Sequence, residues 1–140
     1  MQDENNLVDQ TLVERVTQLV PLLRKHAREA EQQRRLPDEV VTALKATGML
    51  SMYKPRRHGG LEARPSTAVE AWTELGRGCG STSWVVSQLN NTMLLACLFL
   101  PQTAREEIFA QPEVHVASVF IGKDAVARRV PGGYALHADR

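Results

Sequence analysis

The pattern of apolar residues changes once along the chain, from helical spacing to a pattern typical of strands. Up to about residue 110, apolar residues recur every three or four positions, as in amphipathic helices. Residues 114–121 are β-branched and small without that period, and residues 125–138 indicate a hairpin around Pro131-Gly132-Gly133. A hairpin alone is at best marginally stable in water. The strands therefore require more sheet than these residues supply, and we expect the tail to begin a second, incomplete domain.

Proline, glycine and capping residues divide the helical part. We expect helices over residues 7–34, 37–48, 67–77, 82–99 and 101–110. Pro21 removes a backbone hydrogen bond from the first helix, so a kink or a break into two helices is expected there. Pro37 suits the first turn of the second helix, and Gly48 suits its end.

Two serine or threonine positions are candidates for helix starts. Thr67 and Glu70 have the spacing of a capping box, which would begin the third helix. Ser81 can cap the fourth helix. This fourth helix, residues 82–99, is apolar almost all the way round, and such a helix belongs in the middle of a bundle.

Composition limits the classes of function. The chain has 140 residues, 43% of them hydrophobic, and a formal charge of +1, which gives no argument for nucleic acid or an anionic membrane as partner. The longest apolar run is too short to cross a bilayer, and the N-terminus has no signal-peptide pattern. We expect a cytoplasmic protein in which Cys79 and Cys97 are reduced and mostly buried.

The basic stretch "KPRRHGG", residues 54–60, has two readings. The paired glycines Gly59 and Gly60 allow a sharp turn between helices, because glycine reaches backbone angles closed to other residues. The basic side chains could contact phosphate, but no wider basic stripe accompanies them. We therefore interpret this cluster as a solvated loop.

The stretches "RLPDEVVTALKATGML", "GCGSTSWVV", "FLPQTAREEIF" and "VASVFIGKDAVARRVPGGYALHADR" together resemble the acyl-CoA dehydrogenase superfamily. More narrowly, they are similar to its two-component, reduced-flavin-dependent monooxygenases, such as the large component of hydroxyphenylacetate hydroxylase. The resemblance implies a mainly α fold, the N-terminal helical domain followed by the first strands of the central β domain. It places the helical domain at residues 1–112 and the start of an incomplete β domain at residues 113–140.

The resemblance also implies site residues. Trp84 is expected near the substrate pocket, and Thr92, two turns further along the helix, is expected to face the same cavity. Phenol-hydroxylating members commonly carry histidine at this second position, whereas a threonine hydroxyl cannot act as a base at neutral pH. Ser118 is expected on a strand beside substrate and flavin. The alternative is that Trp84 is a core residue, Thr92 an ordinary helix residue and Ser118 a solvent-facing strand residue.

Phe120 and Gly122 follow Ser118 on the same expected strand, and the resemblance implies that they lie beside the flavin. The sequence offers no nucleophile with a base, no carboxylate pair and no metal-ligand set, so no catalytic residue is assigned. Such an absence is consistent with a flavin enzyme, in which the cofactor carries the oxygen chemistry and the protein supplies position and excludes water.

The leading hypothesis is the N-terminal part of a flavin-dependent monooxygenase. It would use reduced FMN or FAD from a separate flavin reductase to oxidise an aromatic or other small organic substrate, as a homo-oligomer without nucleic acid or membrane partners. The chain could be inactive without the remaining domain. One alternative is an acyl-CoA dehydrogenase with tightly held FAD. Another is a non-catalytic helical module that pairs with a partner through its strand edge.

Overall fold

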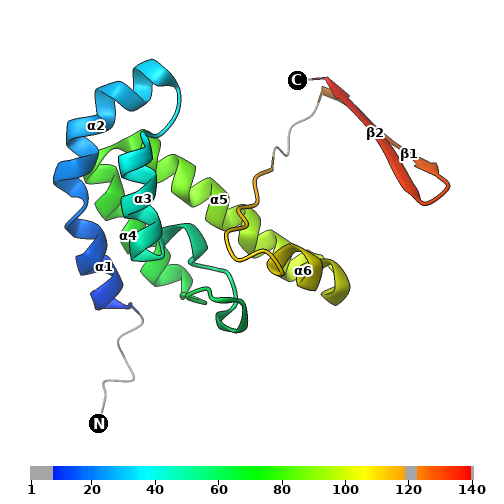
Figure 1. The fold of residues 1–140 in the computed structure, drawn as a ribbon, viewed down its shortest axis with the longest axis horizontal. Helices are drawn as coiled ribbons and strands as arrows, with labels where there is room; N and C mark the ends of the chain where they lie inside the picture. The colour runs from blue at the N-terminus through cyan, green and yellow to red at the C-terminus, as the bar shows by residue number, and fades with distance from the viewer. Residues whose placement is uncertain (1–7, 119–122, 140) are drawn as a thin grey trace, which may run out of the picture.

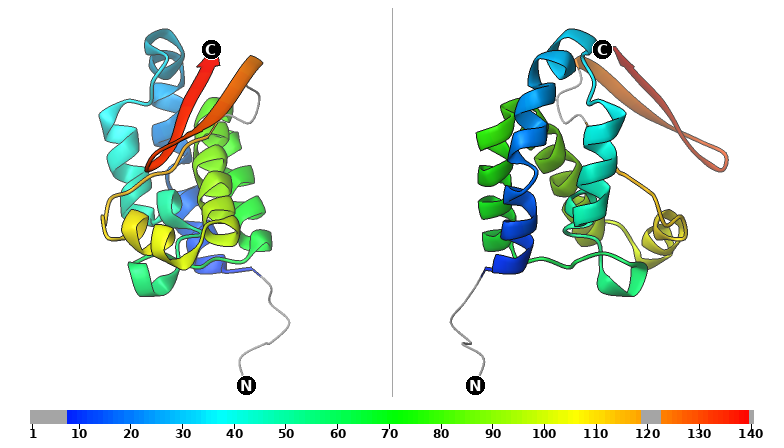
Figure 2. Two further views of the ribbon diagram at one scale, coloured as in Figure 1. Left: turned by 90° about the vertical axis from the view of Figure 1, so that its right-hand side faces the viewer. Right: turned by 60° about the vertical axis from the view of Figure 1, so that its left-hand side comes forward.

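The computed structural model describes residues 8–118 and 123–139. It consists of a helical body and a two-stranded hairpin that stands away from it (Figures 1 and 2). The elements in chain order are α1 (Gln10–Thr17), α2 (Val20–Gln33), α3 (Asp38–Thr47), η1 (Met49–Ser51), η2 (Arg56–His58), α4 (Pro65–Gly78), α5 (Gly80–Phe99), α6 (Gln102–Phe109), β1 (Lys123–Val130) and β2 (Gly133–Asp139). This confirms the mainly α fold. No helix in the described part of the chain is both long and apolar enough to span a membrane.

The expected break at Pro21 is confirmed. The first helical segment divides into α1 and α2, and Pro21 lies in the first turn of α2. Backbone N–H groups in the first turn have no partner within the helix, so proline, which lacks this group, is tolerated there. The start and end of α3 are confirmed too. Pro37 directly precedes the helix, and Gly48 ends it with a φ of 82°, a left-handed conformation that favours glycine.

Both expected serine and threonine caps are wrong. The helix α4 begins at Pro65, two residues before Thr67, because proline fits the first helical position. The Thr67 hydroxyl instead accepts a hydrogen bond of 2.9 Å from the backbone N–H of Asp9 and joins α4 to α1. Ser81 lies inside α5, which begins at Gly80. The single residue Cys79 ends α4 and precedes α5, forming a one-residue corner between the two helices.

The core lies where α1, α2, α3 and α5 pack around α4 and η1 (Figure 2). Asn90 is a polar residue at its centre and is completely buried. Its Oδ1 accepts from the backbone N–H of Met52 at 2.9 Å, and its Nδ2 donates to the carbonyls of Met49 at 2.7 Å and Val86 at 2.8 Å. Asn90 therefore fixes α5 against η1 and the residue that follows it.

A histidine joins α2 to α3 at the surface. His26 Nδ1 lies 2.7 Å from Glu29, and its Nε2 lies 2.7 Å from Glu39. The hydrogen bond to Glu29 has the largest effect and raises the pKa of His26; burial opposes it, and the hydrogen bond to Glu39 raises the pKa further. The bond from His26 lowers the pKa of Glu39. The contact is therefore strongest when the imidazole is protonated and the carboxylates are ionised.

The expectation that α5 lies in the middle of the bundle is only half right. One face, with Val86, Asn90 and Met93, is buried in the core. Large apolar residues on the rest of the helix are exposed, including Trp84 at 67%, Leu98 and Phe99. Length explains the exposure of Leu98 and Phe99, because α5 has 20 residues against 14 in α4, and its far end extends beyond the other core helices (Figure 1). Trp84 lies near the start of α5, on its outward face.

The expected hairpin is confirmed. Strands β1 and β2 pair antiparallel, and Val130 faces Gly133 across a two-residue turn of Pro131 and Gly132, whose φ is 84°. The expected strand at residues 114–121 is not seen in its described part. Residues 114–118 are extended, but no strand in the described structure pairs with them, and a strand needs a partner for its backbone groups. Residues 119–121 lie outside the described residues.

Candidate functional site

The second half of α5 and the extended segment after α6 border an open cavity of about 320 Å³. Its lining consists of Thr92, Leu95, Ala96, Phe99, Leu100, Val116 and Ser118. Figure 1 shows the segment, drawn from gold to orange, running from α6 back alongside α5. All lining residues but two are apolar, so the cavity suits a flat apolar group of the size of a small aromatic ligand.

The two hydroxyl groups of this cavity form a chain of hydrogen bonds. Thr92 Oγ1 donates to the backbone carbonyl of Gln88 at 2.9 Å and lies 3.0 Å from Ser118 Oγ. A hydroxyl has one proton, and that of Thr92 goes to Gln88. The Ser118 hydroxyl is therefore the donor to Thr92. Its oxygen keeps lone pairs that can accept a hydrogen bond from a ligand.

The charged residues at the start of the segment lie outside the lining of this cavity. A hydrogen bond from Lys45 lowers the pKa of Glu113, and the two side chains are 2.8 Å apart. Partial burial lowers the pKa of His115, and the nearby Lys45 lowers it further, which favours the neutral imidazole. The described wall thus offers hydroxyl oxygens and apolar surface, without an ionised side chain.

The expected site residues do not all lie together. Thr92 and Ser118 meet in the cavity, although they are 26 positions apart. Trp84 instead lines a separate groove of about 420 Å³ between α4 and α5, together with Val69, Trp72 and Ser83. Because Trp84 is 67% exposed, it is not a core residue either. Phe120 and Gly122, the residues expected beside the flavin, lie outside the described residues.

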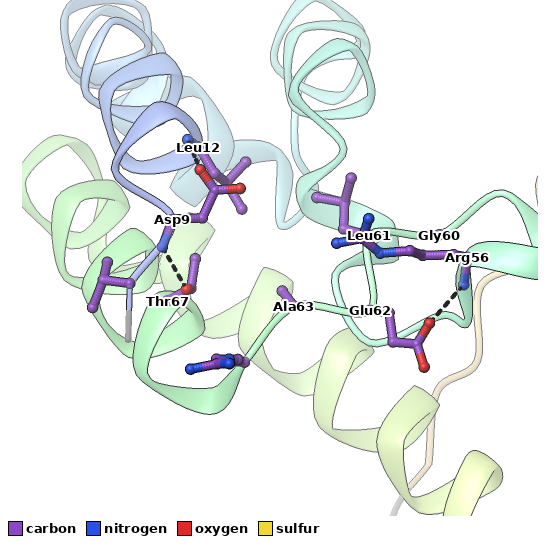
Figure 3. Close-up of a pocket in the computed structure, with 10 residues that line it drawn as sticks. Asp9, Leu12, Arg56, Gly60, Leu61, Glu62, Ala63 and Thr67 are labelled. Atoms are coloured by element: carbon purple, nitrogen blue, oxygen red, sulfur yellow. Dashed lines mark hydrogen bonds between the residues drawn. The ribbon is translucent and has the colours of Figure 1, made fainter. Parts of the chain in front are cut away.

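A second, polar cavity was not foreseen. It has a volume of about 560 Å³ and lies between the start of α1 and the loop that leads into α4 (Figure 3). Its lining includes Arg56, Arg64 and Glu62, and the Glu62 carboxylate accepts from the backbone N–H of Arg56 at 3.3 Å. Asp9 accepts from the N–H of Leu12. Sequence reasoning missed this cavity because its two sides lie about 50 positions apart without a shared motif.

The basic stretch at residues 54–60 is not wholly a solvated loop, because Lys54 is only 1% exposed. Its ammonium donates to the carbonyl of Pro112 at 2.8 Å and lies 6.0 Å from the ring centre of Phe109. The paired glycines do make the expected turn. Gly59 has a φ of 82°, and Gly60 packs directly onto the carbonyl of Lys54, where a Cβ would lie 1.9 Å from the oxygen.

Comparison with known proteins places the helical part in a family. Residues 8–107 match the model described as acyl-CoA dehydrogenase, N-terminal domain. Over 131 residues the chain is 34% identical to the oxygenase subunit HsaA of a flavin-dependent monooxygenase from Mycobacterium tuberculosis, covering 91% of this chain and 32% of that protein. It is 30% identical over 129 residues to the oxygenase component of p-hydroxyphenylacetate 3-hydroxylase from Acinetobacter baumannii, covering 92% and 30%.

Solved structures of similar proteins agree with this family assignment. The crystal structure of HsaA from M. tuberculosis superposes with a TM-score of 0.84 at 33% identity, covering 92% of this chain and 35% of that one. XiaF from Streptomyces sp., in complex with FADH2 and glycerol, superposes with a TM-score of 0.82 at 37% identity, covering 91% and 32%. The chain spans about a third of the length of the curated relatives it matches.

Proposed function

This chain belongs to the acyl-CoA dehydrogenase family through its N-terminal helical domain, and from that premise we propose that it forms one wall of the active site of a flavin-dependent monooxygenase. The division into a helical domain, residues 1–112, and the start of a β domain, residues 113–140, is part of this proposal. The last helix ends at Phe109, and the hairpin stands apart from the helices (Figure 1), which supports that division.

The observation that carries the proposal is the hydrogen-bond chain from Ser118 through Thr92 to Gln88 at the cavity between α5 and the extended segment. Since the Ser118 proton is already donated, its oxygen is left to accept from a substrate O–H or N–H group. We propose a small aromatic or other organic substrate that carries such a donor. Its apolar part would contact Leu95, Phe99 and Val116.

A reduced flavin would lie against the open side of this cavity, next to the substrate, where apolar side chains and the Ser118 hydroxyl suit an isoalloxazine ring, which has one apolar and one polar edge. When bound, it would supply the electrons for the reduction of O2 and the transfer of one oxygen atom to the substrate. The apolar residues of α5 would then help to exclude water from the reacting centre. The FADH2 held by XiaF supports FAD as the flavin, and FMN remains the second choice.

Thr92 orients the substrate through Ser118 and does not remove a proton, because a threonine hydroxyl is not a base at neutral pH. The chain therefore suits substrates whose ring reacts without deprotonation by this position. A separate reductase would supply the reduced flavin, since HsaA and the A. baumannii protein are named as oxygenase components. A homo-oligomer is part of the proposal, supported by the exposed apolar residue Leu98 of α5.

The test is a chimera in which this chain replaces the matching third of M. tuberculosis HsaA. The folded chimera is mixed with reductase, NADH and either FAD or FMN, and aromatic compounds are screened under ¹⁸O2. We expect a product that carries one ¹⁸O atom. Ser118→Ala should raise the KM for substrates with an O–H or N–H donor and leave that of their O-methylated or N-methylated analogues unchanged. Ser87→Ala, on the groove beside Trp84, is the matched control.

Two results would contradict the proposal. One is a folded chimera that binds reduced flavin but converts all NADH to hydrogen peroxide with every compound, while parent HsaA forms product. The other is oxidation of acyl-CoA thioesters with an artificial electron acceptor, which would favour the dehydrogenase alternative.

A further inference from the structure

Lys54 is the most unusual charged residue of the described chain, because its side chain is almost fully buried. Burying an ammonium group costs several kcal/mol unless strong contacts compensate for the lost water. Lys54 forms no ion pair with a carboxylate among the described residues. Its direct contacts are the Pro112 carbonyl at 2.8 Å and the face of Phe109, and the Glu113 carboxylate attracts it at longer range. Methionine has a similar length and would fill the same space without that cost. The charge therefore has a role beyond packing.

The backbone of Lys54 is itself held firmly. Its carbonyl accepts from the N–H of Glu62 at 3.1 Å and lies directly against Gly60. The ammonium therefore extends from a fixed point of the helical body. It reaches the carbonyl of Pro112, three residues after the end of α6.

The segment that Lys54 holds is the one that forms the far side of the candidate cavity. Residues 112–118 run from Pro112 to Val116 and Ser118, which line the cavity. Three contacts attach this segment to the helices. They are the bond from Lys54 to Pro112, the ion pair of Lys45 with Glu113 at 2.8 Å, and the bond of Ser118 with Thr92 at 3.0 Å.

These contacts differ in strength. The Lys45–Glu113 pair is exposed, with 46% and 77% of its side chains accessible, and exposed pairs contribute little. The Lys54 bond comes from a charged side chain that is 1% exposed, and charged hydrogen bonds are about twice as strong as neutral ones. We propose that Lys54 is a positioning residue, which holds the segment at Pro112 so that Ser118 meets Thr92. Its role in substrate binding rests on the proposed function above, whereas its effect on the position of Ser118 does not.

The experiment measures that position directly, without flavin or substrate. Thr92→Cys and Ser118→Cys are combined in the 140-residue chain, and the effective concentration of the two introduced thiols is measured in a glutathione redox buffer. Peptide mass spectrometry identifies the disulfide between these two positions and separates it from reactions of the native Cys79 and Cys97. Lys54→Met is then added. The expected result is a fall in effective concentration of about tenfold, because a charged hydrogen bond is lost.

Two further variants separate positioning from general destabilisation. Val16→Ala removes buried atoms from α1, away from the segment, and should change the effective concentration less than about twofold. Lys54→Gln keeps a polar side chain that is too short to reach Pro112, and it replaces Lys54→Met if the latter does not fold. An unchanged effective concentration in the folded Lys54 variant overturns the proposal. An equal fall in Val16→Ala overturns it as well.

Discussion

Replacing Asn90 with leucine is expected to lower the free energy of unfolding by about 2–6 kcal/mol. The side chain is completely buried, and two of its hydrogen bonds are the ones that satisfy the N–H of Met52 and the carbonyl of Met49. Leucine fills a similar volume but leaves both backbone groups buried without a partner. Each such group costs about 1–3 kcal/mol. The carbonyl of Val86 is less affected, because it also accepts the helical N–H four residues on.

The assay is equilibrium unfolding in urea followed by circular dichroism. Asn91→Leu is the matched control, because Asn91 is the next residue of α5 and is exposed. Its effect should stay within about 0.5 kcal/mol. A loss below about 1 kcal/mol for Asn90→Leu would refute the argument that the two backbone groups depend on this side chain.

Asn90→Asp tests the direction of the same hydrogen bonds. The new carboxyl keeps an acceptor for Met52 but places an oxygen against the carbonyls of Met49 and Val86, where Nδ2 donated before. Repulsion and burial raise the pKa of this carboxyl in the folded state, because its protonated form can donate. The protonated carboxyl therefore stabilises the fold at low pH, and this contribution is lost as pH rises through that pKa. The deficit relative to the parent should shrink from about pH 8 to about pH 4, and a constant deficit would argue against the assignment.

Two more predictions concern the loop and the surface. The pKa of His26 is raised from its ordinary value of 6.5, chiefly by Glu29, so its stabilisation is present below that pH and is lost as pH rises through the raised value. The difference in Tm between the chain and His26→Gln should therefore be largest near about pH 5.5 and vanish by about pH 9, and a pH-independent difference would contradict this. Gly60→Ala should lower the free energy of unfolding in urea by at least about 3 kcal/mol, since its Cβ would lie 1.9 Å from the Lys54 carbonyl oxygen. Gly59→Ala, with open space but a φ of 82°, should cost about 1–2 kcal/mol, and equal losses at the two glycines would rule out the steric explanation.

The features of the fold that sequence reasoning found are those with local causes. Pro21 divides the first helix because a proline cannot donate in a helix interior, and Gly48 ends α3 because that position has a positive φ. Thr67 shows the limit of such rules. Its spacing from Glu70 fits a capping box, but its hydroxyl bonds to α1, and a contact across 58 positions has no local signal.

The candidate site shows the same division. The resemblance to a family indicated Thr92 and Ser118, which the structure brings within hydrogen-bond distance. It also indicated Trp84, which lies in a different groove. Lys54 and Asn90 could not be found from the sequence, because a lysine in a basic stretch and an asparagine in a helix both read as surface residues. Their burial depends on tertiary packing, which composition and spacing do not report.

Because Cys79 is the single residue between α4 and α5, it fixes which face of α5 is directed toward α4. An inserted residue there would change both the direction and the rotation of α5 relative to the helices already docked. Asn90 would swing away from η1, and Thr92 would lose its register with Ser118 in the same movement. Homologues that differ in length should therefore keep the single residue between α4 and α5 and place their insertions elsewhere.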